Sequence, residues 1–112
     1  MTELPKGDCF KASVDFMVNN PDIKQIVTLV HAEVRGRGPI EGIRMGHSWV
    51  ELGDYVIDVA NGKRHLIKKE LYYQVAEIDK SEGKYIRYSF DEMIENVLEN
   101  KTYGHWELNV KQ

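Results

Sequence analysis

The chain contains a single cysteine, Cys9, in a position where a thiol can act as a nucleophile. It follows Asp8, a residue type that favours the start of a helix, and a helical pattern of apolar residues comes after it. Backbone N–H groups at a helix start carry partial positive charge, which favours the nucleophilic thiolate. His47 and Asp58 complete the set, since a histidine can take the proton of a nucleophile while a carboxylate orients the ring. These three residue types predict acyl-transfer chemistry on sulfur.

The turn between the segments that carry His47 and Asp58 predicts that their side chains meet. Gly53-Asp54 is typical of a two-residue hairpin loop between two short apolar strands. This loop length places Trp49 opposite Asp58, and because side chains alternate between faces, His47 lies on the same face. His47 and Asp58 are then diagonal neighbours, roughly 7 Å apart at the backbone. We expect Asp58 to bind one imidazole nitrogen and the other nitrogen to face Cys9, whose helix end packs against this face.

Periodicity and turn residues predict the elements that position these side chains. The expected elements are a helix over 9–18, a mostly buried strand over 25–34, a loop over 35–45, strands over 47–52 and 55–60, a short helix over 68–76, a strand over 84–88 and a final helix that starts after Ser89. Ser89 and Glu92 form a capping box, an apolar stripe that includes Leu98 follows, and Gly104 is expected to end the helical region. This order predicts an α+β domain in which the helix bearing Cys9 packs on a mainly antiparallel sheet.

Length and composition limit the class of protein. At 112 residues, with 42% hydrophobic and 29% charged side chains, the chain is expected to form one soluble domain over 1–112. A net charge of −3 argues against nucleic acid as a partner, because phosphate binding needs clustered positive charge. A single cysteine excludes an internal disulfide, and no apolar run is long enough to cross a membrane. We therefore expect a cytoplasmic protein that has no membrane partner.

One stretch of the sequence resembles a known family. The run Gly46-His47-Ser48-Trp49-Val50-Glu51, followed by Val56-Ile57-Asp58, resembles the His-Ala-Trp-Val-Glu … Asp signature of transglutaminase-like proteins in the papain-like superfamily. Cys9 on a helix and the strand after it match the earlier elements of that family, so the resemblance covers roughly positions 7 to 62. It implies a papain-like fold in which Cys9 is the nucleophile, His47 the base and Asp58 the orienting carboxylate. Ser48 stands where the family usually has alanine, and Val59 follows the aspartate where proline is common.

These observations predict a thiol-dependent acyl-transfer enzyme with a Cys-His-Asp triad and no cofactor or metal. The expected reaction is hydrolysis of a peptide, isopeptide or related amide bond, with transfer to an amine as the other outcome. Trp49, Arg37 and Trp106 are expected to contact the substrate. Because so short a chain leaves little material for a specificity pocket, the peptide or protein substrate is expected to be supplied or shaped by a partner protein. The oligomeric state stays open.

Other functions remain open at this point. A catalytically silent papain-like fold can hold a peptide with the loop over 35–45 or with the aromatic cluster over 103–106. The arginines of that loop either bind an acidic group or are simply solvated. Cys9, His47 and Asp58 can instead hold zinc, although no closely spaced pair of ligands supports this. His31 and Glu33 share one face of the buried strand and form either a core pair or a support for the site.

Overall fold

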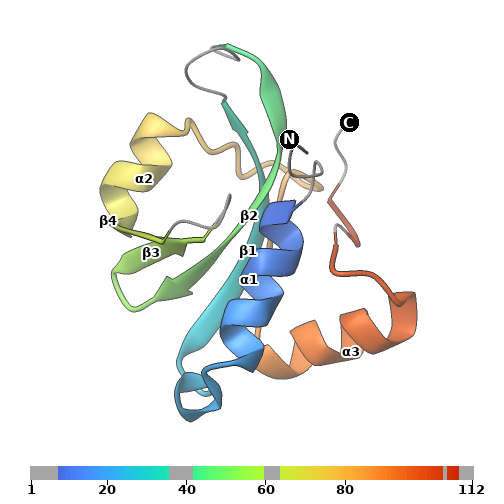
Figure 1. Cartoon of the computed structure of the whole chain (residues 1–112). Helices are drawn as coiled ribbons and strands as arrows, with labels where there is room; N and C mark the ends of the chain where they lie inside the picture. The colour runs from blue at the N-terminus through green and yellow to red at the C-terminus, as the bar shows by residue number, and fades with distance from the viewer. Residues whose placement is uncertain (1–7, 36–41, 60–63, 105, 109–112) are drawn as a thin grey trace, which may run out of the picture.

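The chain folds into a five-stranded antiparallel sheet with helices packed on both of its faces (Figure 1). The computed structural model describes residues 8–35, 42–59, 64–104 and 106–108. The elements along the chain are α1 (Asp8–Val18), a 3₁₀ turn η1 (Pro21–Ile23), β1 (Val27–Arg35), β2 (Arg44–Leu52), β3 (Tyr55–Asp58), β4 (His65–Lys68), α2 (Lys69–Val75), β5 (Tyr85–Tyr88) and α3 (Phe90–Asn100). The strands lie in the order β4-β3-β2-β1-β5. The expected α+β class is confirmed, and the N-terminal helix carries Cys9.

The hairpin that carries the candidate residues has the predicted register. Val50 of β2 pairs with Ile57 of β3, and Gly53 in the turn has a positive φ of 60°. β2 begins at Arg44, earlier than predicted, because it pairs with β1 along its whole length. The end predicted for the second strand, Ala60, lies outside the described residues. The parity argument that places His47 and Asp58 on one face therefore rests on a turn of the correct length.

Two apolar clusters cover the two faces of the sheet, and they divide the helices between them. The cluster between the sheet and helices α1 and α3 consists of Val14, Met17, Val27, Leu29, Val50, Ile57, Tyr88 and Met93. The face covered by α2 contains Val30, Ala32, Val34, Trp49 and Val56. Side chains alternate between these clusters along β1 and β2, as the pleat of a strand requires. In Figure 1, α1 and α2 accordingly lie on opposite sides of the two central strands.

The two later helices differ from the prediction in their details. The pattern over 68–76 predicts that Leu71, Tyr72 and Val75 share one side of the helix. In α2, however, Leu71 and Val75 are 54% and 46% exposed, while Tyr72 and Tyr73 face the sheet. The capping box at Ser89 is confirmed, but α3 ends at Asn100, where Lys101 in a left-handed conformation forms the C-cap. Gly104 therefore does not end the helix, and Leu98, predicted on the apolar stripe, is 70% exposed.

The sequence pattern does not predict β4. This strand lies at the edge of the sheet and pairs only with β3. Three of its four residues are exposed, so it lacks the alternation that marks a half-buried strand. Asp8, predicted to cap the first helix, is instead its first residue. Within the described part of the chain, no helix has the length and apolar character needed to cross a membrane.

Candidate active site

The structure brings His47 and Asp58 into direct contact. The Nε2 atom of His47 lies 2.9 Å from Oδ2 of Asp58, and because a carboxylate only accepts, the imidazole donates this hydrogen bond. The side chains are 16% and 15% exposed, so the pair is largely shielded from solvent but still reachable. The hairpin register accounts for the contact, since His47 and Asp58 are diagonal neighbours on one face of β2 and β3.

Cys9 lies in the first turn of α1, is partly exposed, and is close enough to His47 to raise the pKa of the same imidazole. Since Nε2 is bonded to Asp58, Nδ1 is the ring nitrogen left to face the sulfur. The three residues singled out in the sequence are therefore neighbours, although they come from three different elements.

The route by which Cys9 reaches His47 differs from the prediction. The body of α1 packs on the face of Val50, whereas His47 shares the opposite face with Trp49, whose ring centroid lies 6.1 Å from its own. Because Val50 pairs with Ile57, Asp58 lies opposite Trp49, and His47 lies past the last residue of β3. The helix end and the imidazole thus meet where β3 stops, not across one face of the sheet.

The surroundings of His47 favour its protonated form. Burial alone would lower the pKa of this histidine, but the hydrogen bonds and the negative charges of Asp58 and Cys9 outweigh burial and raise its pKa to about 10. At neutral pH the ring therefore carries a proton on each nitrogen. One N–H is directed to Asp58, and the other, on Nδ1, is available to a neighbouring acceptor.

Tyr72 of α2 is a fourth member of this group that sequence reasoning missed. Its hydroxyl donates to Oδ2 of Asp58 at 2.9 Å, the same oxygen that accepts from His47. Only the rotation of α2 about its axis decides that Tyr72 faces the sheet. The helical periodicity of apolar residues in α2 is too weak to predict which of its side chains face the sheet.

Trp49 is not available to a substrate, contrary to expectation. Its side chain is fully buried, and its Nε1 donates to the carboxylate of Glu51 at 3.0 Å. Glu51 is itself 2% exposed and also accepts from Tyr73 and from Arg87, which forms an ion pair with it. Trp49 and Glu51 of the sequence motif therefore belong to a polar network under α2.

The other residues expected to contact substrate have different outcomes. Arg37 lies outside the described residues. Trp106 is partly buried, packs against the ring of His31 with centroids 5.0 Å apart, and donates from Nε1 to the carbonyl of Thr102 at 3.0 Å. Trp106 is therefore part of the aromatic packing around His31, and the described part of the structure places no substrate-facing surface on it. His31 is fully buried among aromatic rings and does not reach the candidate site through any contact described.

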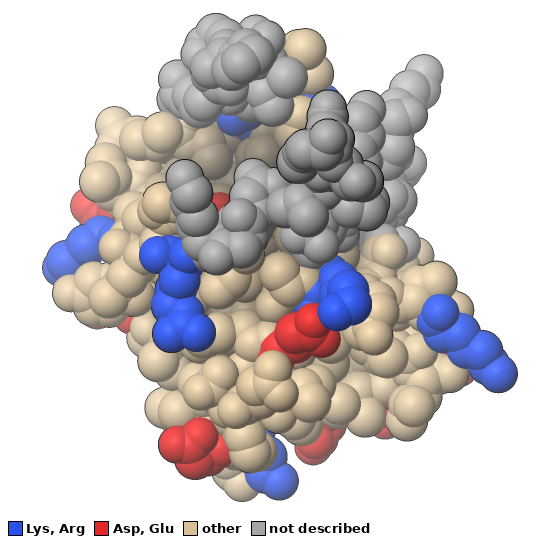
Figure 2. Space-filling model, in the orientation of Figure 1, with Lys and Arg blue, Asp and Glu red and all other residues tan. Residues whose placement is uncertain are grey.

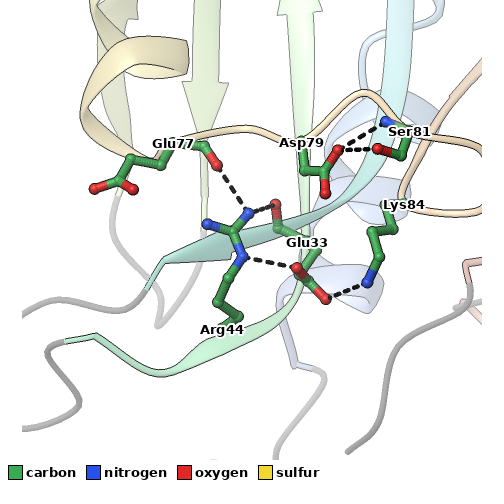
Figure 3. A network of polar contacts seen from close by, with 6 residues as sticks. All are labelled: Glu33, Arg44, Glu77, Asp79, Ser81 and Lys84. Carbon is green, nitrogen blue, oxygen red and sulfur yellow. Dashed lines mark hydrogen bonds and ion pairs between the residues drawn. The ribbon is translucent and has the colours of Figure 1, made fainter.

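The described arginines of the expected loop are strand residues held by carboxyl and carbonyl oxygens. Arg44 donates to Oε1 of Glu33 at 2.7 Å and to the backbone carbonyl of Glu77 at 2.8 Å, as Figure 3 shows. Lys84 contacts the other oxygen of Glu33 at 3.1 Å. Burial would raise the pKa of Glu33, but these cations lower it overall. Arg35 pairs with Glu77, so these groups stabilise the far end of the sheet instead of forming a docking surface for acidic substrates.

The remaining surface offers few alternative sites. On the face drawn in Figure 2, Lys and Arg side chains are scattered among Asp and Glu and form no continuous positive field. Among the described residues, no group of three His, Cys, Asp or Glu side chains is arranged to hold a metal ion. Two hollows are lined by Val97, Leu98, Lys101, Thr102 and Tyr103, and by Asp54, Lys68, Lys69, Glu70, Tyr73, Lys80 and Tyr85. Neither contains a residue of the Cys9–His47–Asp58 group.

Comparison of the chain with protein-family models, with curated proteins and with solved structures gives no match. The function must therefore be argued from the geometry of the site itself.

Proposed function

We propose that this protein is a thiol-dependent acyl-transfer enzyme that hydrolyses a peptide, isopeptide or related amide bond. The observation that carries the proposal is the 2.9 Å hydrogen bond between His47 and Asp58, with Cys9 close enough to the same imidazole to raise its pKa. The order of cysteine, histidine and aspartate along the chain is that of the transglutaminase-like proteins that the sequence resembles. A papain-like relationship is part of the proposal, and the helix-borne cysteine packed on an antiparallel sheet supports it.

The proposed reaction has two halves. The thiolate of Cys9 attacks the acyl carbon, and a tetrahedral intermediate forms. His47 donates its Nδ1 proton to the leaving nitrogen, the C–N bond breaks, and an amine departs while a thioester remains on Cys9. His47, now neutral, takes a proton from water as the water attacks the thioester, and the acid is released as the thiolate of Cys9 leaves, which restores the starting thiolate and protonated His47. An amine in place of water gives transfer instead of hydrolysis.

Two further features support this chemistry. The backbone N–H of Cys9 lies in the first turn of α1, where N–H groups have no acceptor within the helix, so it can donate to the developing oxyanion. Asp58 keeps the imidazole ring oriented, so that the proton leaves from the nitrogen nearest the sulfur. We also propose a cytoplasmic setting, because a catalytic thiol remains reduced there, and a peptide or protein as substrate.

An activated acyl ester tests the proposal without knowledge of the natural substrate. p-Nitrophenyl acetate should acetylate Cys9, which intact-mass spectrometry detects as a thioester that hydroxylamine removes, and should then turn over slowly as water hydrolyses it. His47→Ala should slow acetylation by about 10²-fold, since it removes the imidazolium that favours the thiolate of Cys9. Glu99→Ala is the control, because Glu99 is exposed on α3, a helix that carries none of the three site residues, and should leave the rate unchanged.

Two results would overturn the proposal. One is acetylation of Cys9 no faster in the folded protein than in the chain unfolded by urea. The other is a rate that His47→Ala leaves unchanged. Either result would favour the silent peptide-binding fold, in which the thiol has no activated form.

A further inference from the structure

Tyr72 is positioned to control the carboxylate that orients His47. The Tyr72 hydroxyl and the His47 Nε2 both lie 2.9 Å from the same oxygen, Oδ2 of Asp58. The tyrosine ring packs against Trp49 with centroids 5.0 Å apart, and Trp49 is fully buried. The hydroxyl is therefore fixed by the core, so its contact with Asp58 does not depend on a mobile side chain.

The direction of this hydrogen bond is determined by the surroundings. Burial raises the pKa of Tyr72 above its ordinary range, and the negative charges of Asp58, Cys9 and Glu51 raise it further. The phenol thus keeps its proton and acts as a donor. A donor bonded to a carboxylate stabilises the ionised form and makes protonation of that carboxylate harder.

We propose that Tyr72 is a positioning residue of the thiol site, acting through Asp58: it holds that carboxylate ionised and in place to receive the His47 N–H. This inference rests on the proposed function. Tyr72 contacts neither the sulfur nor the substrate in this account. It acts on His47 through two hydrogen bonds that share Asp58, and only through His47 on Cys9.

The inference predicts a change in pH dependence. Among the described residues, the charged or titratable groups around the pair are Asp58 on β3, His65 opposite it on β4, His47 and Glu51 on β2, Cys9 on α1 and Tyr72 itself on α2. Without the hydroxyl, Asp58 is protonated at higher pH, and once protonated it no longer supports the imidazolium that activates the sulfur. The acid limb of Cys9 reactivity should therefore move to higher pH in Tyr72→Phe.

The experiment measures the rate of Cys9 alkylation by iodoacetamide across the pH range in which the protein stays folded. In Tyr72→Phe the acid limb should shift upward by about one pH unit, the size expected for loss of one hydrogen bond to a charged group. Tyr73→Phe is the matched control, because the neighbouring hydroxyl donates to Glu51 instead of Asp58. The Nε2–H proton resonance of His47, followed by NMR, should move in Tyr72→Phe and stay in place in Tyr73→Phe.

A second variant separates positioning from a general loss of packing. In an Asp58→Asn background, Tyr72→Phe should cause no further shift, because the carboxylate through which it acts is gone. The inference is overturned if Tyr72→Phe leaves both the pH profile and the His47 resonance unchanged, or if Tyr73→Phe shifts them equally. Failure of the proposed function looks different: wild-type Cys9 would then be no more reactive than in the unfolded chain, while the His47 resonance would still respond to Tyr72→Phe.

Discussion

Gly104 lies close to Phe10 at the start of α1, and a methyl group added at Gly104 should disturb the packing there. A Cβ added at Gly104 would lie 2.7 Å from Cδ1 of Phe10 and 2.9 Å from Cε1 of His31, well below the 3.4 Å at which ordinary contact begins. Phe10 is 3% exposed and His31 is fully buried, and their rings pack edge to face. Neither ring can retreat without opening the core. Because Phe10 follows Cys9 directly, the displacement should reach the candidate nucleophile.

The expected cost of Gly104→Ala has two parts. The φ of Gly104 is +134°, which a side chain rarely adopts, and such strain costs about 1–3 kcal/mol. Overpacking of a closed core adds about 1–3 kcal/mol. Together these predict a loss of about 2–6 kcal/mol in the free energy of unfolding. Gly53→Ala is the matched control: φ there is +60° and nothing lies within 4 Å of the added methyl, so only about 1–2 kcal/mol should be lost.

Urea unfolding of the two variants measures this difference. A double-mutant cycle with Phe10→Leu should recover part of the loss in Gly104→Ala and none in Gly53→Ala, because only the former is strained against that ring. Acetylation of Cys9 should also slow in Gly104→Ala. Equal destabilisation by Gly104→Ala and Gly53→Ala would show that the close approach is not a constraint on the fold, and the reasoning would be wrong.

Three further predictions concern contacts elsewhere in the molecule. His47 should titrate near pH 10 by NMR of its ring, and Asp58→Asn should lower this pKa, since burial then acts with less opposition; an unchanged value would contradict the assigned cause. Arg87→Met should reduce the free energy of unfolding in urea by about 2–3 kcal/mol, because it leaves the buried carboxylate of Glu51 without its nearest cation. Ser89→Ala should cost about 1 kcal/mol in the same assay through loss of the helix cap, and no measurable loss would show that the capping box is not stabilising.

The parts of the fold that the sequence predicted are those set by local rules. The turn at Gly53-Asp54 and the alternation of side chains along a strand suffice to bring His47 and Asp58 together, since both rules act within a dozen residues. The cap at Ser89 is predictable for the same reason. Cys9 was placed only by the expected helix start and by a resemblance, and the end of β3 decides how it reaches the imidazole.

The parts that could not be predicted depend on tertiary contacts. Tyr72 faces Asp58 because of how α2 rotates on the sheet, and neither Leu71 nor Val75 reveals that rotation, because both are exposed. The sequence pattern predicted a loop at Arg44, but β2 pairs with β1 along its whole length, and this pairing places Arg44 beside Glu33. A strand as short and exposed as β4 forms only because β3 offers it an edge.

The reactivity of Cys9 is the most direct test of the central claim, that His47 and Asp58 activate this thiol. Iodoacetamide alkylation at mildly acidic pH should be compared in the folded wild type, in folded His47→Ala and in the wild-type chain unfolded by urea. The account predicts that the folded wild type reacts fastest and that His47→Ala loses this advantage, because the imidazolium that favours the thiolate is gone. A folded wild type that reacts no faster than the unfolded chain would contradict it.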